Sequence, residues 1–280
     1  MRHYVKIKTV QDLIDRIEGQ NVRILCGGTD LVVKMRAGAI DPQVLLDISD
    51  TEDLRGISEE KDAVTIGAAT TVSEIIADPV VAEKLPLLQT VLRTLGSTQI
   101  RNRATLGGNL VNASPAADSA IPLLLYQALV NISGVRGDRV VEIEDFLIAP
   151  GKTALKSDEF VRSVLIPIPQ AAFKPFFHKV GRRKAMIIAI ASLGALVSVK
   201  DDKIDEIRLA AGSVAPRPIR LHELEDNLAG KAITADLIEQ AKLAAVHAVS
   251  PIDDVRASAD YRREVIGELV ARVLRDAAQG

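Results

Sequence analysis

The sequence predicts an α+β fold in two domains, residues 1–169 and residues 170–280. In the first part, short apolar strands alternate with helical stripes, which is the pattern of α/β units. Pro167-Ile168-Pro169 then disfavours regular structure and marks the boundary. Beyond it the order changes to consecutive strands followed by long helices. That order is typical of an antiparallel sheet covered on one side by helices.

The first domain is expected to divide into two subdomains, about residues 1–53 and 54–169. In the first, Thr9 is a suitable N-cap for an amphipathic helix over Val10–Ile17. In the second, Asp78-Pro79 opens a helix by placing proline in its first turn. The strands expected in the two subdomains cover residues 4–8, 22–25, 44–48, 63–68, 129–133, 140–143 and 159–167, with further helices over 29–35, 70–74, 87–95 and up to 125.

The second domain is expected to begin with strands over residues 176–180, 187–200 and 203–211. Asp201-Asp202 forms the turn between the last two strands. Helices over 234–248 and 259–276 follow, the second with Ser258 as its N-cap. The apolar residues of this last helix recur at helical spacing and predict one face packed on the sheet.

Composition excludes several classes of function. The net charge of −2 and the pI of about 6.1 predict no basic face for nucleic acid. Cys26 is the one cysteine, so the chain alone cannot hold a disulfide framework, an iron–sulfur cluster or a cysteine-based zinc site. The histidines lack metal-ligand spacing, and we predict neither a catalytic residue nor a metal ligand. With no apolar membrane span or signal peptide evident, a cytoplasmic protein is expected.

Two segments each combine a Gly-Gly pair with polar residues. We call Cys26-Gly27-Gly28-Thr29-Asp30-Leu31 the first glycine segment and Thr105-Leu106-Gly107-Gly108-Asn109 the second glycine segment. Glycine is costly within regular structure but suits positive φ or close approach of the backbone. A glycine turn that opens a helix presents unpaired N–H groups, which suit phosphate. A tight turn without a ligand would explain one pair, whereas two pairs in one domain predict two backbone clamps on one diphosphate.

The two glycine segments are accompanied, in order along the chain, by Ile66-Gly67-Ala68-Ala69-Thr70-Thr71, Gln99-Ile100-Arg101-Asn102, Ser114-Pro115-Ala116-Ala117-Asp118, Lys179-Val180-Gly181-Arg182-Arg183 and Asp254-Val255-Arg256-Ala257-Ser258-Ala259-Asp260-Tyr261-Arg262. With these motifs the chain closely resembles the FAD-binding (medium) subunit of the molybdenum hydroxylases. That family includes xanthine, carbon monoxide and nicotinate dehydrogenases. The resemblance extends over nearly the whole chain, although Cys26 stands where the family often has Ala. A small, buried thiol should be tolerated there.

The resemblance implies FAD as the cofactor. It also implies a two-subdomain FAD-binding domain of the p-cresol methylhydroxylase / vanillyl-alcohol oxidase type, followed by an α+β C-terminal domain. Asp118 would bond sugar or ribityl hydroxyls, and Lys179 would approach the isoalloxazine; otherwise Lys179 is a solvated strand lysine. The implied cofactor-binding residues are Gly27, Gly28, Thr29, Asp30, Leu31, Thr105, Gly107, Gly108, Asn109, Asp118, Phe160, Val161 and Lys179.

The resemblance also implies partner chains: a large molybdopterin-binding subunit and a small subunit with two-iron, two-sulfur clusters, in a heterohexamer of two three-chain units. Electrons would pass from those clusters through FAD to NAD, a quinone or oxygen. The alternatives are a self-contained FAD-dependent oxidoreductase of the same flavin fold and an assembly subunit without cofactor. The basic run Arg182–Lys184 is expected to be a solvated turn, or else a contact with cofactor or partner. His178, beside Lys179, is the histidine nearest to an implied site residue.

Overall fold

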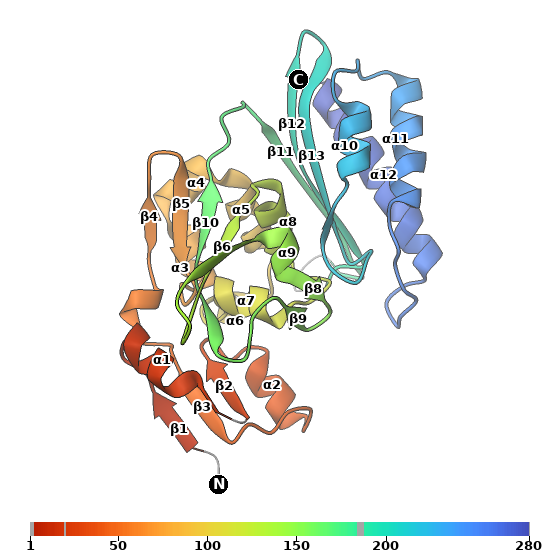
Figure 1. Ribbon diagram of the computed structural model, residues 1–280. Coiled ribbons are helices and arrows are strands. Elements are labelled where there is room, and N and C mark those ends of the chain that lie inside the picture. The colour runs from red at the N-terminus through yellow and green to blue at the C-terminus, as the bar shows by residue number, and fades with distance from the viewer. Residues whose placement is uncertain (1–2, 20, 184–187, 280) are drawn as a thin grey trace. The chain divides into compact units, whose positions relative to one another are not determined.

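The computed structural model describes residues 3–19, 21–183 and 188–279 (Figure 1). The chain forms two compact units, each assembled from separate stretches of sequence. The first unit consists of Met1–Leu85, Gly96–Ala113 and Ala128–Pro167. The second unit consists of Pro86–Leu95, Ser114–Gln127 and Ile168–Gly280. The division at residue 169 that the sequence suggests therefore remains a proposal about domains, and it does not coincide with these units.

The first unit begins with a small parallel sheet of order β1-β3-β2. Thr9 caps its first helix as predicted, because its hydroxyl accepts the N–H of Asp12. Leu13, Ile17 and Leu46 are buried in the core between helix and sheet. The elements are β1 (His3–Lys6), α1 (Val10–Ile17), β2 (Val22–Leu25), α2 (Leu31–Arg36) and β3 (Val44–Asp47).

The first unit continues in a five-stranded antiparallel sheet of order β4-β5-β10-β6-β7. Thr71 and Glu74 form a full capping box at the start of α3, and Asp78 caps α4 ahead of Pro79. The strands are β4 (Ile57–Glu59), β5 (Ala63–Gly67), β6 (Leu129–Gly134), β7 (Arg139–Glu142) and β10 (Glu159–Pro167), and β8 (Leu147–Ala149) pairs with β9 (Lys152–Thr153). The helical elements are η1 (Glu52–Leu54), α3 (Val72–Ala77), α4 (Pro79–Lys84), α6 (Thr98–Arg101), α7 (Leu106–Asn112) and α9 (Ile143–Phe146).

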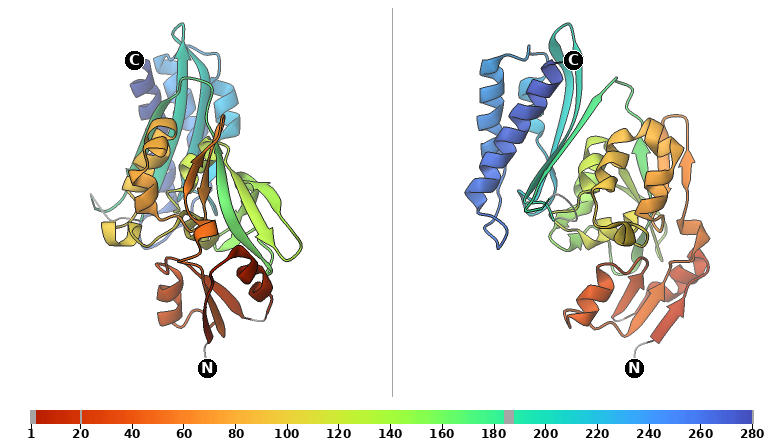
Figure 2. Two further views of the ribbon diagram at one scale, coloured as in Figure 1. Left: turned by 90° about the vertical axis from the view of Figure 1, so that its left-hand side faces the viewer. Right: turned by 180° about the vertical axis from the view of Figure 1, so that it is seen from behind.

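The second unit is built on an antiparallel sheet of order β11-β12-β13-β14. Asp201 and Asp202 have φ of 51° and 58°, and they form the predicted turn between β12 and β13. Figures 1 and 2 show the C-terminal helices together on one face of this sheet. The elements are β11 (Lys174–Val180), β12 (Ala191–Lys200), β13 (Lys203–Gly212), β14 (Ile219–Arg220), α10 (His222–Leu228), α11 (Ala235–His247) and α12 (Ala259–Ala278).

The other face of this sheet is also covered, which the sequence did not predict. Two helices from earlier in the chain, α5 (Pro86–Arg93) and α8 (Ala120–Leu125), belong to the second unit. A Cβ on Gly194 would lie 2.4 Å from Cγ2 of Ile121, so glycine is what lets α8 lie against β12. The flanking Leu193 and Ala195 point into the core shared with α11 and α12. The sheet is thus enclosed between two helical layers.

Other local predictions can be compared with the structure. The strand expected from residue 187 runs over Ala191–Lys200, while residues 184–187 lie outside the described residues. Sequence patterns did not indicate α9, α10 or the short strands β4, β8, β9 and β14. None of the helices described over residues 3–19, 21–183 and 188–279 combines the length and apolar character needed to cross a membrane.

Candidate functional site

The first unit contains a cavity of about 530 Å³, and both glycine segments line it. Residues of β2, α2, α7, β10 and the stretch after β9 form its wall. Phe160 and Val161, on β10, are 3% and 4% exposed and contribute apolar surface. The structure therefore brings together most of the residues implied by the resemblance: Gly27, Gly28, Thr29, Asp30, Leu31, Thr105, Gly107, Gly108, Asn109, Phe160 and Val161.

The first glycine segment forms the turn between β2 and α2. Gly28 has φ of 74°, a conformation that favours glycine. A Cβ on Gly27 would lie 1.9 Å from the carbonyl oxygen of Arg103, so that position admits no side chain. Among the described residues, none accepts a hydrogen bond from the backbone N–H of Gly28, Thr29 or Asp30. Three successive amides at the cavity wall are therefore available to an anion.

The second glycine segment differs from the expected clamp. Its glycines lie in the first turn of α7, not in a turn before it. Gly107 N–H donates to the Ala68 carbonyl at 3.0 Å, and Gly108 N–H donates to the Thr105 hydroxyl at 3.2 Å. Asn109 N–H donates to the Thr105 carbonyl at 3.0 Å. Because these amides already donate to acceptors within the protein, the second glycine segment has no free N–H among them for a ligand and can contribute only space.

The two glycines of the second segment have different neighbours. A Cβ on Gly107 would lie 2.6 Å from Cβ of Ala68 and 2.8 Å from its carbonyl oxygen, so Gly107 serves packing. Gly108 is exposed, and a Cβ there would meet only Oγ1 of Thr105, at 2.9 Å, among the described residues outside the helix backbone. Gly108 is therefore the glycine of this pair that leaves space for a ligand.

Asp118 and Lys179 pair with each other inside the second unit. The Lys179 ammonium lies 2.6 Å from Oδ2 of Asp118 and 3.4 Å from the Thr94 carbonyl oxygen. The Lys179 and Asp118 side chains are 6% and 9% exposed, so Lys179 is not a solvated lysine. Burial raises the pKa of Asp118, and the Lys179 ammonium opposes that rise. Oδ1 of Asp118 is buried without a hydrogen-bond partner among the described residues, which leaves an acceptor for a hydroxyl donor.

Cys26 occupies a partly buried position on the cavity wall. It packs against the apolar core of the first sheet together with Val22 and Ile24. Burial raises the pKa of its thiol, partly offset by a hydrogen bond with Thr105. The thiol therefore behaves as a small apolar side chain, as the sequence suggested.

Polar residues at the cavity wall include several that sequence reasoning missed. Lys34 on α2 and Asn112 on α7 line it beside Asp30, and Arg23, Lys156 and Glu159 line it as well. The signal for Lys34 was its position four residues after Asp30, which places both on one side of a helix. No local pattern pointed to Asn112, because its partners lie about eighty residues away in the sequence.

Glu159 holds the edge of the cavity through charge-assisted hydrogen bonds. Its carboxylate accepts Nε and Nη2 of Arg139 at 2.9 and 2.7 Å, and the N–H of Lys156 at 2.8 Å. Chiefly because of Arg139, the pKa of Glu159 falls to about 2. The ionised form is thus favoured by folding, so stability is full at neutral pH and is lost as pH falls from about 4.5 towards 2.

We expect Glu159→Gln to lower the free energy of unfolding by roughly 2–3 kcal/mol at pH 7. This is less than the full equivalent of the depressed pKa, because the Arg139 side chain is one-third exposed and solvent screens the pair. The difference from wild type should shrink as pH falls through that window and vanish near pH 2. Urea unfolding of both proteins at steps between pH 7 and pH 2 measures it. A difference that stays constant with pH would show that the Arg139 contact does not depend on the charge.

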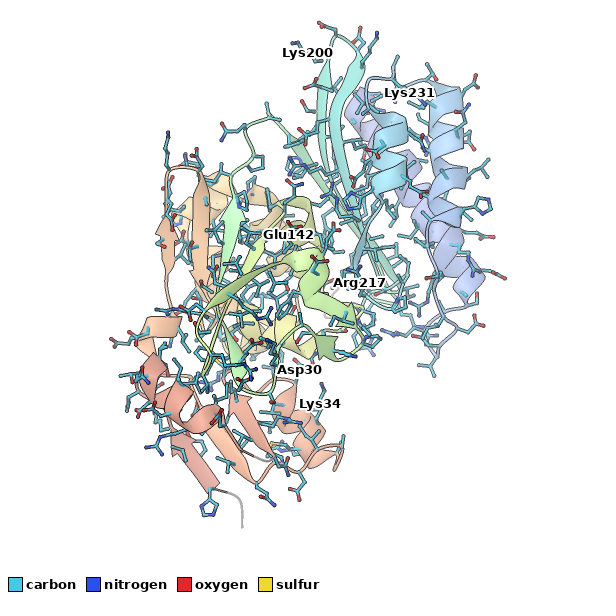
Figure 3. The ribbon with its side chains drawn as sticks, in the orientation of Figure 1. Asp30, Lys34, Glu142, Lys200, Arg217 and Lys231 are labelled. Carbon is cyan, nitrogen blue, oxygen red and sulfur yellow. The ribbon has the colours of Figure 1, made fainter. Side chains whose placement is uncertain are left out.

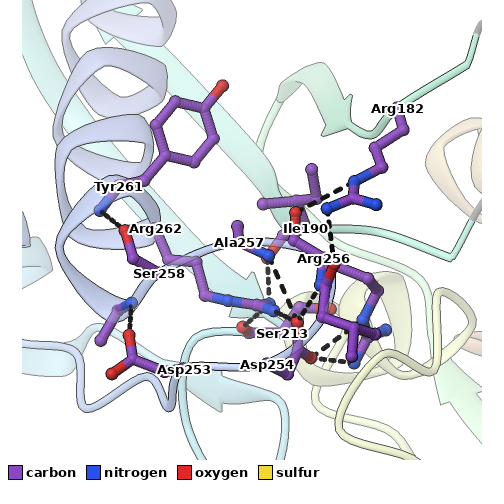
Figure 4. A network of polar contacts seen from close by, with 12 residues as sticks. Arg182, Ile190, Ser213, Asp253, Asp254, Arg256, Ala257, Ser258, Tyr261 and Arg262 are labelled. Atoms are coloured by element: carbon purple, nitrogen blue, oxygen red, sulfur yellow. Dashed lines mark hydrogen bonds and ion pairs between the residues drawn. The ribbon is translucent and has the colours of Figure 1, made fainter.

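Arg182, in the basic run after β11, makes hydrogen bonds within the second unit (Figure 4). Arg182 donates through Nε to the Arg256 carbonyl at 3.2 Å and through Nη2 to the Val255 carbonyl. Arg182 and Arg183 are exposed in a bend, as expected for a solvated turn, and Arg182 in addition anchors the segment before α12. Lys184 lies outside the described residues. His178 is largely buried, and burial lowers its pKa. His178 belongs to no metal-ligand cluster, since no described group of three His, Cys, Asp or Glu could hold a metal ion.

The segment before α12 is fixed by a buried arginine (Figure 4). Arg262, 2% exposed, donates through Nη1 to the carbonyls of Ile190 and Ser213 at 2.6 and 3.0 Å. Its Nη2 lies 2.6 Å from Oδ1 of Asp254. Asp254 also accepts Nε and Nη2 of Arg256 at 2.9 and 2.6 Å, which holds the pKa of its carboxyl well below the usual range. The motif Asp254–Arg262 is therefore structural in this unit.

The chain is similar to known proteins over its whole length. Residues 1–169 match the FAD binding domain in molybdopterin dehydrogenase, and residues 176–277 match the CO dehydrogenase flavoprotein C-terminal domain. The chain is 32% identical over 276 residues to the glyceraldehyde dehydrogenase medium chain of Sulfolobus acidocaldarius, covering 98% of each. It is 30% identical to the carbon monoxide dehydrogenase medium chain of Hydrogenophaga pseudoflava, over 91% of this chain and 89% of that one. The solved quinoline 2-oxidoreductase of Pseudomonas putida 86 superposes with a TM-score of 0.94 at 29% identity, over 100% of this chain and 98% of the other.

Proposed function

Because this chain belongs to the family of FAD-binding medium subunits of the molybdenum hydroxylases, we propose that it passes electrons from iron–sulfur clusters on a partner chain, through its FAD, to NAD, a quinone or oxygen. The chain is the flavoprotein part of an oxidoreductase, and FAD supplies the redox chemistry when bound. The observation that carries the proposal is the row of free amides at Gly28, Thr29 and Asp30 in the wall of the cavity.

The residues present fit the diphosphate of FAD. Free backbone N–H groups are donors to phosphate oxygens, and they add no competing negative charge. Gly108 leaves open space beside them, and Phe160 and Val161 provide apolar wall. We propose that the first glycine segment donates hydrogen bonds to the diphosphate, and that the absence of a side chain in the second segment lets the diphosphate approach the backbone closely. In this assignment Thr105 contributes as the cap that fixes the first turn of α7.

Asp118 and Lys179 suit the sugar and ring parts of the cofactor. Oδ1 of Asp118 is an acceptor that lacks a donor among the described residues, which fits a ribityl or ribose hydroxyl. Lys179 holds the other carboxylate oxygen, so the carboxylate keeps one orientation. A lysine at the flavin edge would favour negative charge on the reduced ring. We propose both roles from this chemistry and from the resemblance.

The chain also requires partners for the proposed electron path. Its single cysteine cannot ligate a two-iron, two-sulfur cluster, which needs four ligands. Relatives are named medium chains, which accords with large and small partner subunits. We propose the heterohexamer of two three-chain units for this complex, together with the cytoplasmic location expected from the sequence.

Purification of the native complex tests the proposal. We expect the chain to carry a visible flavin spectrum and to co-purify with chains that contain molybdenum and iron. Anaerobic addition of NADH should then bleach the flavin if NAD is the physiological acceptor. A flavin-bearing chain that purifies alone and oxidises a substrate by itself would favour the self-contained oxidoreductase instead. A folded chain without flavin, which also fails to take up added FAD, would refute both.

A further inference from the structure

A polar bridge spans the cavity wall of the first unit between α2 and α7. The Lys34 ammonium donates to Oδ1 of Asn112 at 2.6 Å. The amide Nδ2 of Asn112 donates in turn to Oδ1 of Asp30 at 3.1 Å. All three residues line the cavity, and Figure 3 labels Asp30 and Lys34 beside each other. Asn112, three residues after the second glycine segment, therefore hydrogen-bonds to both Asp30 and Lys34, which lie four residues apart in the sequence.

The bridge fixes the orientation of the asparagine amide. The ammonium of Lys34 can only donate, so it must face Oδ1 of Asn112. The carboxylate of Asp30 can only accept, so it must face Nδ2. Asp30 makes no side-chain cap to α2, and its carboxylate accepts the hydrogen bond from Asn112 instead. Asn112 thus sets where the Lys34 ammonium rests.

Lys34 is the cavity cation best placed to meet a phosphate. Three cationic side chains line the cavity: Arg23, Lys34 and Lys156. Lys156 lies 3.9 Å from Oε1 of Glu159, and Arg23 bonds the carbonyl of its neighbour Val22. Lys34 has no carboxylate within 4 Å among the described residues, and a neutral amide oxygen holds it. Its charge is fixed in position without being neutralised by an anion in direct contact.

We propose that Lys34 offsets the negative charge of the cofactor's diphosphate, and that Asn112 acts as the positioning residue for Lys34. The inference rests on the proposed FAD site, and it adds a charged contact to the neutral amides of the first glycine segment. Lys34 interacts with the ligand, whereas Asn112 acts only through Lys34. The two substitutions should therefore affect cofactor affinity in a dependent manner, not additively.

Titration of FAD into the flavin-depleted full chain tests the inference. In low salt, Lys34→Met should raise Kd by about two- to fivefold, the range for an exposed charge contact, and this loss should shrink in 0.5 M salt because of screening. Arg36→Met is the matched control: it removes one positive charge from the same helix, at an exposed position that does not line the cavity. Arg36→Met should leave Kd and its salt dependence at wild-type values.

A double-mutant cycle tests the role of Asn112. Asn112→Ala should raise Kd in the wild-type background and have no further effect in Lys34→Met. Equal Kd and salt dependence for Lys34→Met and wild type would overturn the inference, as would equal weakening by Arg36→Met. Additive effects of the two substitutions would overturn the positioning role. Failure of the proposed function looks different, since wild type itself would then not bind FAD. Thermal unfolding of each variant checks that the substitutions on α2 and α7 leave the chain folded.

Discussion

The variant Gly108→Val is expected to lose FAD, by more than a hundredfold in affinity, while the chain stays folded. The valine side chain would add bulk to the wall of the cavity that the first glycine segment also lines, where we propose that the diphosphate lies. Within the protein its Cβ displaces only the Thr105 hydroxyl, so the expected loss of stability is that of a helix cap, about 1 kcal/mol. The ratio of flavin to protein absorbance after desalting, with the unfolding temperature, measures both effects.

Gly107→Ala is the matched comparison for this variant. It adds the smaller side chain at the adjacent position, but there the new Cβ meets the backbone and Cβ of Ala68 at under 3 Å. Gly107→Ala should therefore lower the unfolding temperature by more than the few degrees expected for Gly108→Val. Full FAD occupancy in Gly108→Val would remove the second glycine segment from the binding site.

Asp254→Ala is expected to destabilise the chain by about 3–5 kcal/mol, because it leaves the buried guanidinium of Arg262 without its carboxylate. The Arg256 side chain loses its partner as well, and the segment that Arg182 anchors is freed. Urea unfolding at pH 7 gives the change in free energy. The carboxyl is ionised far below neutral pH, so the full effect is present there.

The control for Asp254→Ala is Asp260→Ala, in the first turn of α12. Asp260 also pairs with an arginine, Arg263 at 2.7 Å, but the two side chains are 89% and 37% exposed. Exposed pairs contribute about 0.2–1 kcal/mol. If the two variants lost equal stability, burial of Arg262 would not be the cause, and the structural role assigned to the Asp254–Arg262 motif would be wrong.

Two kinds of observation support the proposed FAD site. The backbone N–H groups of Gly28, Thr29 and Asp30 have no acceptor among the described residues, and this observation supports the proposed diphosphate site without reference to any relative. The identity of that anion as FAD comes from the family to which the chain belongs. The two glycine segments differ in what they would provide to the cofactor. The first would provide hydrogen-bond donors, and the second would provide space at Gly108.

By itself the sequence determined the elements whose signals are local. Thr9 before an amphipathic stripe gave α1 at its observed bounds, Val10–Ile17. The strand predicted over residues 159–167 is observed as β10, Glu159–Pro167, and Ser258 is the cap of α12 as predicted. Caps, turn residues and apolar periodicity act within a few residues, so they can be recognised without knowing what packs against them. The same holds for the glycine segments, because a Gly-Gly pair by itself indicates a backbone with positive φ or a close neighbour.

Only the tertiary structure decided which groups are already satisfied and which remain for a ligand. Gly107 N–H is taken by Ala68, Asp118 is held by Lys179 sixty-one residues away, and Asn112 ties Asp30 to Lys34. The placement of α8 against the C-terminal sheet, through Ile121 and Gly194, likewise joins distant stretches. Hydrogen-bond partners and packing neighbours are set by chain segments that come together on folding, so they cannot be predicted from local residue preferences.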